Sequence, residues 1–284
     1  MKENNRMIKI KETARVISQE MLVKDIYSMW IETAIAEKTI PGQFISVYTK
    51  SEARLLPRPI SICETGYVSE KQKSMADCSK ENETDRINAS KRKNALRIVY
   101  RIAGEGTREF SAYKAGDSIE ILGPLGNGFK ITDDSAILIG GGIGIPPMLE
   151  LAKQIKGDKT MVVGYRDADM FLDKELVKYG RLVIATDDGS VGTKGNVIDA
   201  IKQHDVTGSV IYACGPTPML RGVKAYAEEK GIDAYISMEE RMACGVGACL
   251  GCVCRTVDID DHSKVKNARI CKDGPVFRAC DIDL

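Results

Sequence analysis

Cys244-Gly-Val-Gly-Ala-Cys249-Leu-Gly-Cys252 indicates more about the architecture of this 284-residue chain than any other segment. With Cys271 it gives the spacing C-x4-C-x2-C…C, which is typical of the ligands of a plant-type two-iron two-sulfur (2Fe-2S) cluster. Such a cluster accepts and releases one electron at a time. We therefore predict that Cys244, Cys249, Cys252 and Cys271 are the metal ligands and that the protein transfers electrons.

The glycines between these cysteines fit the same interpretation. Gly245, Gly247 and Gly251 lack a Cβ, so the backbone can curl tightly and direct its N–H groups at the sulfurs. Structural zinc is the main alternative, because C-x2-C is also a zinc-binding spacing. Zinc sites usually contain a second C-x2-C pair, whereas the distant ligand here is a single cysteine. The iron–sulfur interpretation is therefore favoured.

The remaining cysteines do not form a second pattern. A disulfide framework is typical of short secreted chains, and this long chain of nine cysteines shows no signal-peptide start. Cys254 is expected to point away from the cluster. We interpret Cys63, Cys78 and Cys280 as ordinary thiols, which is consistent with a reducing environment, and the expected location is the cytoplasm.

Size and composition limit the classes of function. A chain of 284 residues can form two or three domains, and 29% charged with 43% hydrophobic residues is ordinary for a globular protein. The net charge of +1 gives no electrostatic basis for binding nucleic acid. No apolar run is long enough to span a bilayer. We therefore expect neither a nucleic-acid partner nor a membrane partner.

Residues 1–129 are expected to form an antiparallel β-barrel. Short runs rich in β-forming residues alternate with turns that contain glycine or proline, such as Pro41-Gly42 and Gly123-Pro124. Long amphipathic helices are missing from the pattern, which favours a small barrel. The predicted strands are 13–17, 26–31, 44–48, 96–102 and 118–122.

Residues 66–94 interrupt this series of strands. The stretch is polar and rich in lysine, asparagine and serine, so it has little apolar surface with which to order itself. We predict an exposed insertion between two strands. A docking loop is the alternative, since long loops are often functional.

Two short motifs in the barrel can bind a diphosphate. Arg58-Pro59-Ile60-Ser61 places an arginine, whose fork of donors matches phosphate oxygens, at the start of a strand. Gly104-Glu105-Gly106-Thr107 adds backbone N–H groups and a hydroxyl. Each motif alone is weak, and Arg58 by itself could be a surface arginine.

Residues 130–234 change to alternating strands and helices, which indicates an α/β domain with a parallel sheet. The apolar strand 136–139 is followed by Gly140-Gly-Gly-Ile-Gly144 and then by two prolines, which suit the first turn of a helix. Glycines at this point let a diphosphate approach the positive end of the helix. Tight packing of strand on helix is the alternative, although we expect it to need fewer glycines. Further strands are predicted at 160–164, 181–186 and 209–213.

The type of nucleotide follows from the charge of two loops. NADP requires basic groups around its extra phosphate. The loops after the strands 160–164 and 181–186 contain one arginine, Arg166, and four carboxylates. The carboxylates are Asp167, Asp169, Asp187 and Asp188. We therefore predict NAD(H) as the co-substrate.

Together the motifs resemble those of the ferredoxin–NADP reductase superfamily. The matching elements are R-P-x-S at Arg58, G-x-G-T at Gly104, the loop Gly123-Pro-Leu-Gly-Asn-Gly-Phe129, and Cys214-Gly215-Pro216 after a strand. The resemblance implies FAD in the barrel and a nicotinamide ring near Cys214, for which a buried thiol is the alternative role. Cys214 is the one candidate for a catalytic role. The implied FAD-binding residues are Arg58, Pro59, Ile60, Ser61, Val99, Tyr100, Arg101, Gly106 and Thr107, and the candidate nucleotide-binding residues are Gly141, Gly142, Gly144, Cys214, Gly215 and Pro216.

Residues 235–284, the expected cluster domain, narrow the resemblance. Glu239-Glu-Arg-Met-Ala-Cys244 and the cysteines after it, with Cys271-Lys-Asp-Gly-Pro-Val-Phe277, are similar to the electron-transfer subunits of NAD-dependent dihydroorotate dehydrogenase B. The resemblance covers nearly the whole chain except 66–94 and the longer connection 258–267. It implies a flavin- and iron–sulfur-dependent oxidoreductase subunit of pyrimidine biosynthesis, with an FMN-containing catalytic subunit as partner in a heterotetramer of two plus two.

In this family electrons would pass from FMN of the partner through the cluster and FAD to NAD⁺. A flavin is needed because nicotinamide carries two electrons together whereas the cluster carries one. A reductase subunit of a related complex, such as a sulfide dehydrogenase or an NAD-dependent ferredoxin reductase, is the first alternative. A non-catalytic sensor of nucleotide or redox state is the second.

Overall fold

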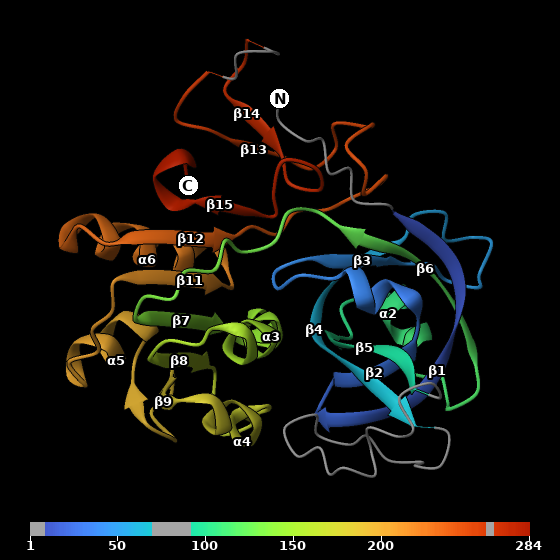
Figure 1. Ribbon diagram of the computed structural model, residues 1–284, viewed down its shortest axis with the longest axis horizontal. Helices are drawn as coiled ribbons and strands as arrows, with labels where there is room; N and C mark the ends of the chain where they lie inside the picture. The colour runs from blue at the N-terminus through green and yellow to red at the C-terminus, as the bar shows by residue number, and fades with distance from the viewer. Residues whose placement is uncertain (1–8, 70–91, 260–263) are drawn as a thin grey trace.

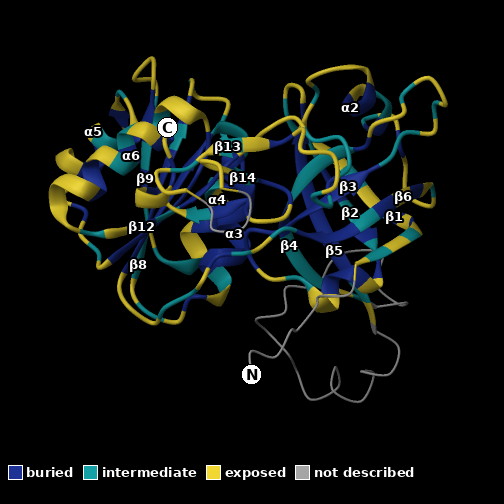
Figure 2. Ribbon diagram, turned by 90° about the horizontal axis from the view of Figure 1, so that it is seen from above, coloured by how far each residue is buried: buried dark blue, intermediate teal, exposed yellow. Residues whose placement is uncertain are grey.

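The computed structural model describes residues 9–69, 92–259 and 264–284 (Figure 1). An all-β part and an α/β part lie next to each other, and the C-terminal segment lies along one side of both. Figure 2 shows that the central strands of both parts are buried and that most helices and loops have exposed surfaces. No helix within the three described ranges combines the length and the apolar character needed to cross a membrane.

The N-terminal part is a closed antiparallel barrel of six strands in the order β1-β2-β5-β4-β3-β6. Alternation explains the barrel: in β6, Ile119 and Ile121 are buried, whereas Ser118 and Glu120 between them are exposed. Closure leaves no free sheet edge. The strands are β1 (Ile10–Val23), β2 (Ile26–Glu32), β3 (Phe44–Val47), β4 (Arg58–Ser69), β5 (Arg92–Arg101) and β6 (Ser118–Leu125). A short helix, α2 (Glu105–Phe110), and the 3-10 helix η1 (Ala34–Lys38) connect them.

The expected barrel is confirmed, but two of its details differ from the prediction. The strand β4 was not predicted beyond its first residues, because a proline and several polar residues hide its alternation. The strand also shortens the predicted insertion, since Gly66 pairs with Ala95 and Ser69 pairs with Arg92. Residues 66–69 and 92–94 therefore belong to the barrel, and residues 70–91 lie outside the described residues.

The second part contains a seven-stranded sheet in the order β10-β9-β8-β7-β11-β12-β15. All neighbours are parallel except β15, which is antiparallel to β12. The strands are β7 (Ala136–Gly141), β8 (Lys159–Tyr165), β9 (Arg181–Thr186), β10 (Thr193–Lys194), β11 (Val210–Cys214), β12 (Asp233–Ser237) and β15 (Val276–Arg278). The helices are α3 (Pro146–Gln154), α4 (Asp173–Leu176), α5 (Val197–Gln203) and α6 (Thr217–Lys230), with the 3-10 helices η3 (Gly142–Gly144) and η4 (Val177–Tyr179).

The centre of this sheet determines where a nucleotide can bind. All residues of β7 and β11 are buried, as expected for parallel strands that are covered on both faces. The strand β7 lies in the middle of the sheet. The strands β8 and β9, which follow it in the chain, lie on one side of it, and β11 and β12 lie on the other side, so the strand order reverses at β7. The crevice at such a switch point, outside the carboxyl ends of the strands, is where ligands bind in open α/β sheets.

The C-terminal segment is joined to both other parts. The expected boundary between residues 234 and 235 falls inside β12, and β15 extends the same sheet. Asn127 at the end of the barrel donates from its backbone N to Gly274 O at 2.6 Å and from its side chain to Asp273 O at 2.9 Å. A hairpin of β13 (Val253–Arg255) and β14 (Asn267–Arg269) and the 3-10 helix η5 (Ala279–Asp281) complete the segment.

Candidate functional site

A cavity of about 570 Å³ lies where the barrel, the α/β part and the C-terminal segment meet. Antiparallel pairing of β4 with β3 and β5 brings the Arg58 motif and the Tyr100 region to the same wall. Eight of the nine residues predicted to bind FAD line this cavity: Arg58, Pro59, Ile60, Ser61, Val99, Tyr100, Arg101 and Thr107.

The ninth predicted residue, Gly106, lies directly behind Arg58. A Cβ on Gly106 would overlap the Arg58 guanidinium group, so glycine is required for the arginine to take this position. The hydroxyl of Thr107 is used within its own loop, where it accepts hydrogen bonds from Ala103 N at 2.9 Å and Gly104 N at 3.2 Å. Thr107 therefore shapes the loop at the cavity in addition to bordering it.

Ten further lining residues were not assigned a role from the sequence. The most informative are those that follow β12, because they connect the cavity to the segment before Cys244. This segment was noticed only as part of a family resemblance, since a run of charged residues carries no flavin-binding pattern. The ten are Phe44, Ala103, Ile143, Ser237, Met238, Glu239, Glu240, Arg241, Met242 and Pro275.

Charges of both signs surround the cavity. Arg58, Arg101 and Arg241 contribute cations suited to a diphosphate, and Glu239 and Glu240 contribute carboxyl groups. Glu239 is exposed within the open cavity, but the protein that surrounds it partly desolvates its carboxyl and raises its pKa, while the Arg101 charge opposes the shift. Glu239 can therefore retain a proton to a higher pH than an ordinary glutamate.

The glycine-rich turn of the second part lies at the switch point beside Cys214. Cys214 ends β11 and pairs in register with Gly140 of β7. A Cβ on Gly144 would come within 2.6 Å of Gly215 N, and a Cβ on Gly215 would come within 3.1 Å of Gly141 N. Packing of the two turns therefore accounts for several of these glycines, so the number of glycines alone does not distinguish a nucleotide site from tight packing.

The remaining candidates of this turn differ in their surroundings. Gly142 has a left-handed backbone with φ +51°, and a Cβ there would meet only the Arg101 guanidinium, at 3.4 Å. Pro216 precedes α6 and packs near Gly141, since its Cδ lies 3.1 Å from a Cβ built on Gly141. Cys214 is buried, and this burial, with the nearby Glu239 charge, raises the pKa of its thiol far above the usual range, although a hydrogen bond with Ser237 opposes the shift. The Cys214 thiol is therefore neutral.

The two acidic loops lie next to each other at the carboxyl ends of β8 and β9. Asp187 N donates to Tyr165 O at 3.2 Å, and Asp188 N donates to Arg166 O at 3.3 Å. Lys194 adds a second cation to this region, which the sequence analysis did not consider. Its side chain packs against Gly189 across the turn, with carbon atoms 2.9 Å from a Cβ built on that glycine. Four carboxylates and two cations remain, so the region disfavours an additional phosphate.

The four predicted cluster ligands come together at the end of the barrel. Cys244 and Cys249 interact through their side chains, Cys252 and Cys271 do the same, and Cys271 lies within electrostatic range of Cys244. Cys252 and Cys271 are buried, Cys244 is half-buried and Cys249 is exposed. Within the part of the chain that the structure describes, no three His, Cys, Asp or Glu side chains are close enough to hold a single metal ion.

Backbone N–H groups surround these sulfurs. Cys244 Sγ accepts from Val246 N at 3.4 Å and Ala248 N at 3.3 Å, and Cys249 Sγ accepts from Gly251 N at 3.4 Å. Cys252 Sγ accepts from Cys271 N at 3.4 Å. Burial would raise the pKa of Cys244, but the N–H donors and Cys249 outweigh it and lower the pKa to about 6. Burial and the adjacent Cys252 raise the pKa of Cys271 to about 12. This donor set fits a sulfur-rich, anionic group.

The loop owes its shape to three left-handed residues, of which the sequence analysis identified two. Gly245 has φ +66° and Gly247 has φ +85°, as a tight curl requires. The third is Leu250, with φ +59°, whereas Gly251 has no positive φ. A leucine in this conformation is strained, and no sequence signal marks it.

Ser46 connects the cluster loop with the barrel. It lies on β3 opposite Pro59 and on the same face of the strand as Phe44, which lines the cavity. Its Oγ is the one buried side-chain nitrogen or oxygen among the described residues that has no hydrogen-bond partner. Because a Cβ on Gly245 would lie 2.9 Å from this oxygen, Ser46 directly adjoins the loop that begins at Cys244.

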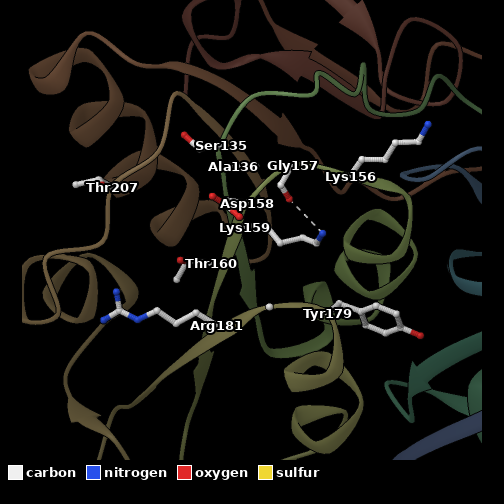
Figure 3. A pocket seen from close by; sticks show the side chains of 11 residues that line it. Ser135, Ala136, Lys156, Gly157, Asp158, Lys159, Thr160, Tyr179, Arg181 and Thr207 are labelled. Carbon is white, nitrogen blue, oxygen red and sulfur yellow. Dashed lines mark hydrogen bonds between the residues drawn. The ribbon is translucent and has the colours of Figure 1, made fainter. Parts of the chain in front are cut away.

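A second cavity, of about 450 Å³, lies at the opposite, amino-terminal edge of the parallel sheet (Figure 3). Two of its three cations are already paired with backbone carbonyls: Lys159 Nζ donates to Ile155 O at 2.6 Å and Gly157 O at 3.3 Å, and Arg181 donates to His204 O at 3.0 Å. These contacts close the end of α3 and the edge of the sheet. The cavity is therefore explained by local structure and lies away from the predicted site residues.

Comparison with known proteins agrees with this arrangement. Residues 239–283 match the iron–sulfur cluster binding domain of dihydroorotate dehydrogenase B, and residues 138–225 match the oxidoreductase NAD-binding domain. The first match favours iron–sulfur over zinc. A solved structure of the NADH-dependent reduced ferredoxin–NADP oxidoreductase, studied for flavin-based electron bifurcation, aligns with a TM-score of 0.77 and 25% identity. The alignment covers 96% of this chain and 90% of that chain.

Curated relatives align over nearly their full length. The dihydroorotate dehydrogenase B (NAD(+)) electron transfer subunit of Listeria monocytogenes serotype 4a is 40% identical over 95% of this chain and 98% of its own. The subunit of the same name from Fusobacterium nucleatum is 38% identical over 96% and 98%. The cavity, the glycine-rich turn and the four-cysteine loop lie within the region that aligns with these relatives. The chain belongs to the family of electron-transfer subunits of NAD-dependent dihydroorotate dehydrogenase B.

Proposed function

We propose that this chain carries electrons between the catalytic subunit of a dihydroorotate dehydrogenase and NAD⁺ in pyrimidine biosynthesis. One observation carries the proposal: a single cavity is bordered by Ile143 of the glycine-rich turn and by Met242, two residues before Cys244. A flavin there adjoins the nucleotide site on one side and the cluster loop on the other. Bound FAD supplies the exchange between two-electron and one-electron transfer.

The chain's own residues bind and orient these groups. Arg58, backed by Gly106, would bind the diphosphate of FAD, and residues 59–61 and 99–101, which line the same cavity, would contact the rest of the molecule. The glycine-rich turn and Cys214-Gly215-Pro216 shape the nucleotide site at the switch point. Cys244, Cys249, Cys252 and Cys271 would hold the 2Fe-2S cluster. Backbone N–H groups donate to the cysteine sulfurs, to Cys244 Sγ from the loop and to Cys252 Sγ from Cys271, and would stabilise the anionic cluster.

The partner surface is proposed at the tip of the cluster loop. Leu250, beside the exposed Cys249, is 62% exposed and is held in a strained conformation. Strain that persists at an exposed apolar tip is expected where the shape serves binding. Four more apolar side chains of this segment are exposed: Val253, Val257, Ile259 and Val265. We propose that an FMN-containing catalytic subunit covers this tip, in a cytoplasmic heterotetramer of two plus two.

The purified chain alone tests the first part of this proposal. It is expected to contain one FAD and two iron atoms, to oxidise NADH with an artificial electron acceptor, and to leave dihydroorotate unchanged. Flavin and iron analysis with an anaerobic NADH titration gives the answer. A chain without flavin, or one that oxidises dihydroorotate without a partner, contradicts the proposal.

A matched pair of variants tests the partner surface. Leu250→Glu places a charge at the tip and is expected to weaken co-purification with the catalytic subunit while NADH oxidation with a dye remains normal. Met21→Glu changes an apolar residue of similar exposure, 59%, on β1 of the barrel and serves as the control. Equal co-purification of both variants would rule out docking at this tip.

A further inference from the structure

Five charged side chains bridge the barrel and the α/β part on the side of β4 and β5. We name them the interdomain ion cluster: Glu64 of β4, Arg97 of β5, Glu150 and Lys153 of α3, and Glu175 of α4. The Arg97 side chain is 6% exposed and that of Glu150 is 5% exposed. Charges buried to this degree are costly unless they are paired, so the contacts among them constrain the parts that carry them.

Arg97 connects the barrel to α4. Its guanidinium group makes a bidentate contact with Glu175, at 2.6 and 3.1 Å, and its Nε donates to Ser28 Oγ at 2.8 Å. A third contact reaches Glu64 at 3.4 Å. Bidentate arginine–carboxylate pairs fix direction as well as distance, so α4 is held in one orientation against the barrel.

The second half of α3 is attached to β4 in the same way. The Glu150 carboxylate accepts from Thr65 N at 2.8 Å and from Thr65 Oγ1 at 3.2 Å. Lys153 Nζ donates to Glu64 at 2.8 Å and to Thr65 O at 3.3 Å. Burial lowers the pKa of Lys153, but Glu64 and Glu150 outweigh this effect and raise it, so the contact persists at neutral pH.

The two elements joined in this way are those that carry the proposed cofactor sites at their other ends. The strand β4 begins with Arg58 at the flavin cavity and reaches Thr65 after roughly 20 Å of extended chain. The helix α3 begins directly after the glycine-rich turn and presents Glu150 and Lys153 one and two turns later. A strand and a short helix are stiff, so contacts at one end set the relative position of the other ends.

We infer that the interdomain ion cluster positions the nucleotide site against the flavin site. Glu150, Lys153, Glu175 and Arg97 are thus positioning residues for hydride transfer between NAD(H) and FAD, and they touch neither group. The inference rests on the site assignments proposed above. Transfer rates are sensitive to small misplacements of the reacting groups, so a change in the cluster should affect the rate more than the binding of either group.

Glu150→Ala is the central variant, measured in the full chain with its cofactors bound. It removes both contacts to Thr65. We expect the rate of flavin reduction at saturating NADH to fall roughly ten- to hundredfold in stopped flow, while flavin content and the dissociation constant for NAD⁺ change less than about threefold. The long-wavelength absorbance of the flavin–nicotinamide complex is expected to weaken in parallel, because it depends on how the two rings overlap.

Two further variants and one control keep the test decisive. Glu150→Gln keeps an acceptor for Thr65 N and leaves two cations facing two carboxylates, so it is expected to recover most of the rate. Glu175→Ala removes the partner of Arg97 on α4, and Glu175 is the more exposed residue of that pair. This variant serves as the test if Glu150→Ala does not fold. Glu32→Ala breaks the ion pairs of Glu32 with Arg15, at 2.7 Å, and with Lys93, at 2.8 Å. Both lie within the barrel, so this variant is expected to keep the wild-type rate.

The outcomes separate the inference from the proposed function. A lower unfolding temperature with an unchanged rate at saturating NADH in Glu150→Ala and Glu175→Ala overturns the positioning role and leaves the proposed function intact. A wild-type chain whose flavin is not reduced by NADH overturns both. A selective loss of rate that Glu150→Gln restores and Glu32→Ala does not share supports the inference.

Discussion

The hydroxyl oxygen of Ser46 lies 2.9 Å from the position that a Cβ on Gly245 would occupy, so the barrel and the cluster loop meet with no room for a side chain. Ser46 belongs to the strand that runs beside the Arg58 motif, and Gly245 follows the first cluster cysteine. The fit of the cluster loop against this barrel strand therefore depends on one glycine. Its left-handed backbone, with φ +66°, is a second reason for glycine at this position.

Gly245→Ala is expected to reduce the iron content of the purified chain to well below half that of the wild type. The new methyl group overlaps the Ser46 hydroxyl, and the left-handed backbone adds about 1–2 kcal/mol of strain. Both effects displace Cys244 from the other ligands. Iron analysis and the visible absorbance of the cluster measure the loss.

Gly231→Ala is the matched control for this prediction. Gly231 ends α6 with the same φ of +66°, but no atom lies within 4 Å of a Cβ built there. It should lower the unfolding temperature without loss of iron. A second test, Gly245→Ala combined with Ser46→Ala, removes the overlap but keeps the strain, and is expected to recover part of the iron. Full iron content in Gly245→Ala alone would contradict the account.

Replacement of any one of the four ligand cysteines by serine is expected to abolish the cluster absorbance. Cys254→Ser is the control, because Cys254 Sγ points at Ala268 O, 3.6 Å away, on the neighbouring strand β14. Its absorbance should equal that of the wild type. The ligand assignment is wrong if Cys254 proves essential and Cys271 does not.

Arg58→Ala is expected to weaken FAD binding roughly tenfold or more, since a charge-assisted contact to the diphosphate contributes about 1.5–3 kcal/mol. Flavin retention during gel filtration and a titration of the apoprotein measure the change. Arg108→Ala removes an exposed arginine of α2 that pairs with Glu105 and does not line the cavity, so it should retain FAD. Equal retention in both variants contradicts the role given to Arg58.

NADH is expected to be preferred over NADPH by about tenfold or more in kcat/KM, because carboxylates near an extra phosphate repel it by about 1 kcal/mol for each unit-charge pair at 4 Å even in water. Hydrogen bonds with Ser190 lower the pKa of Asp188, so its charge is present at neutral pH. The double variant Asp187→Ser with Asp188→Ser should reduce the preference. Asp133→Ser with Asp134→Ser, at the opposite edge of the sheet, should leave it unchanged, and equal use of both nucleotides by the wild type would refute the charge argument.

The sequence was sufficient for features that depend on residues close together in the chain. The C-x4-C-x2-C loop, the Arg58 motif and the glycine-rich turn each combine a spacing with a local backbone requirement, so they could be recognised without a structure. The barrel and the parallel sheet followed from the change in strand and helix pattern, and both are confirmed.

The features that were missed depend on contacts between distant segments. Arg97 and Glu175 are 78 positions apart, and neither belongs to a motif, so only the folded structure shows that they pair. Ser46 is an ordinary strand residue until β3 is placed beside the cluster loop. Leu250 occupies a conformation that favours glycine, and a sequence pattern predicts glycine there instead. The lining residues Glu239 to Met242 are charged or flexible and carry no flavin-binding signature.

Dihydroorotate-dependent reduction of NAD⁺, followed at 340 nm under anaerobic conditions, tests the central claim most directly. The account predicts no NADH from this chain alone or from the FMN-containing catalytic subunit alone, and steady NADH formation when the two are combined. It also predicts that Cys249→Ser stops this reaction while NADH oxidation with a dye continues through the flavin. NADH formation by either subunit alone, or full activity of the complex with Cys249→Ser, would contradict the account.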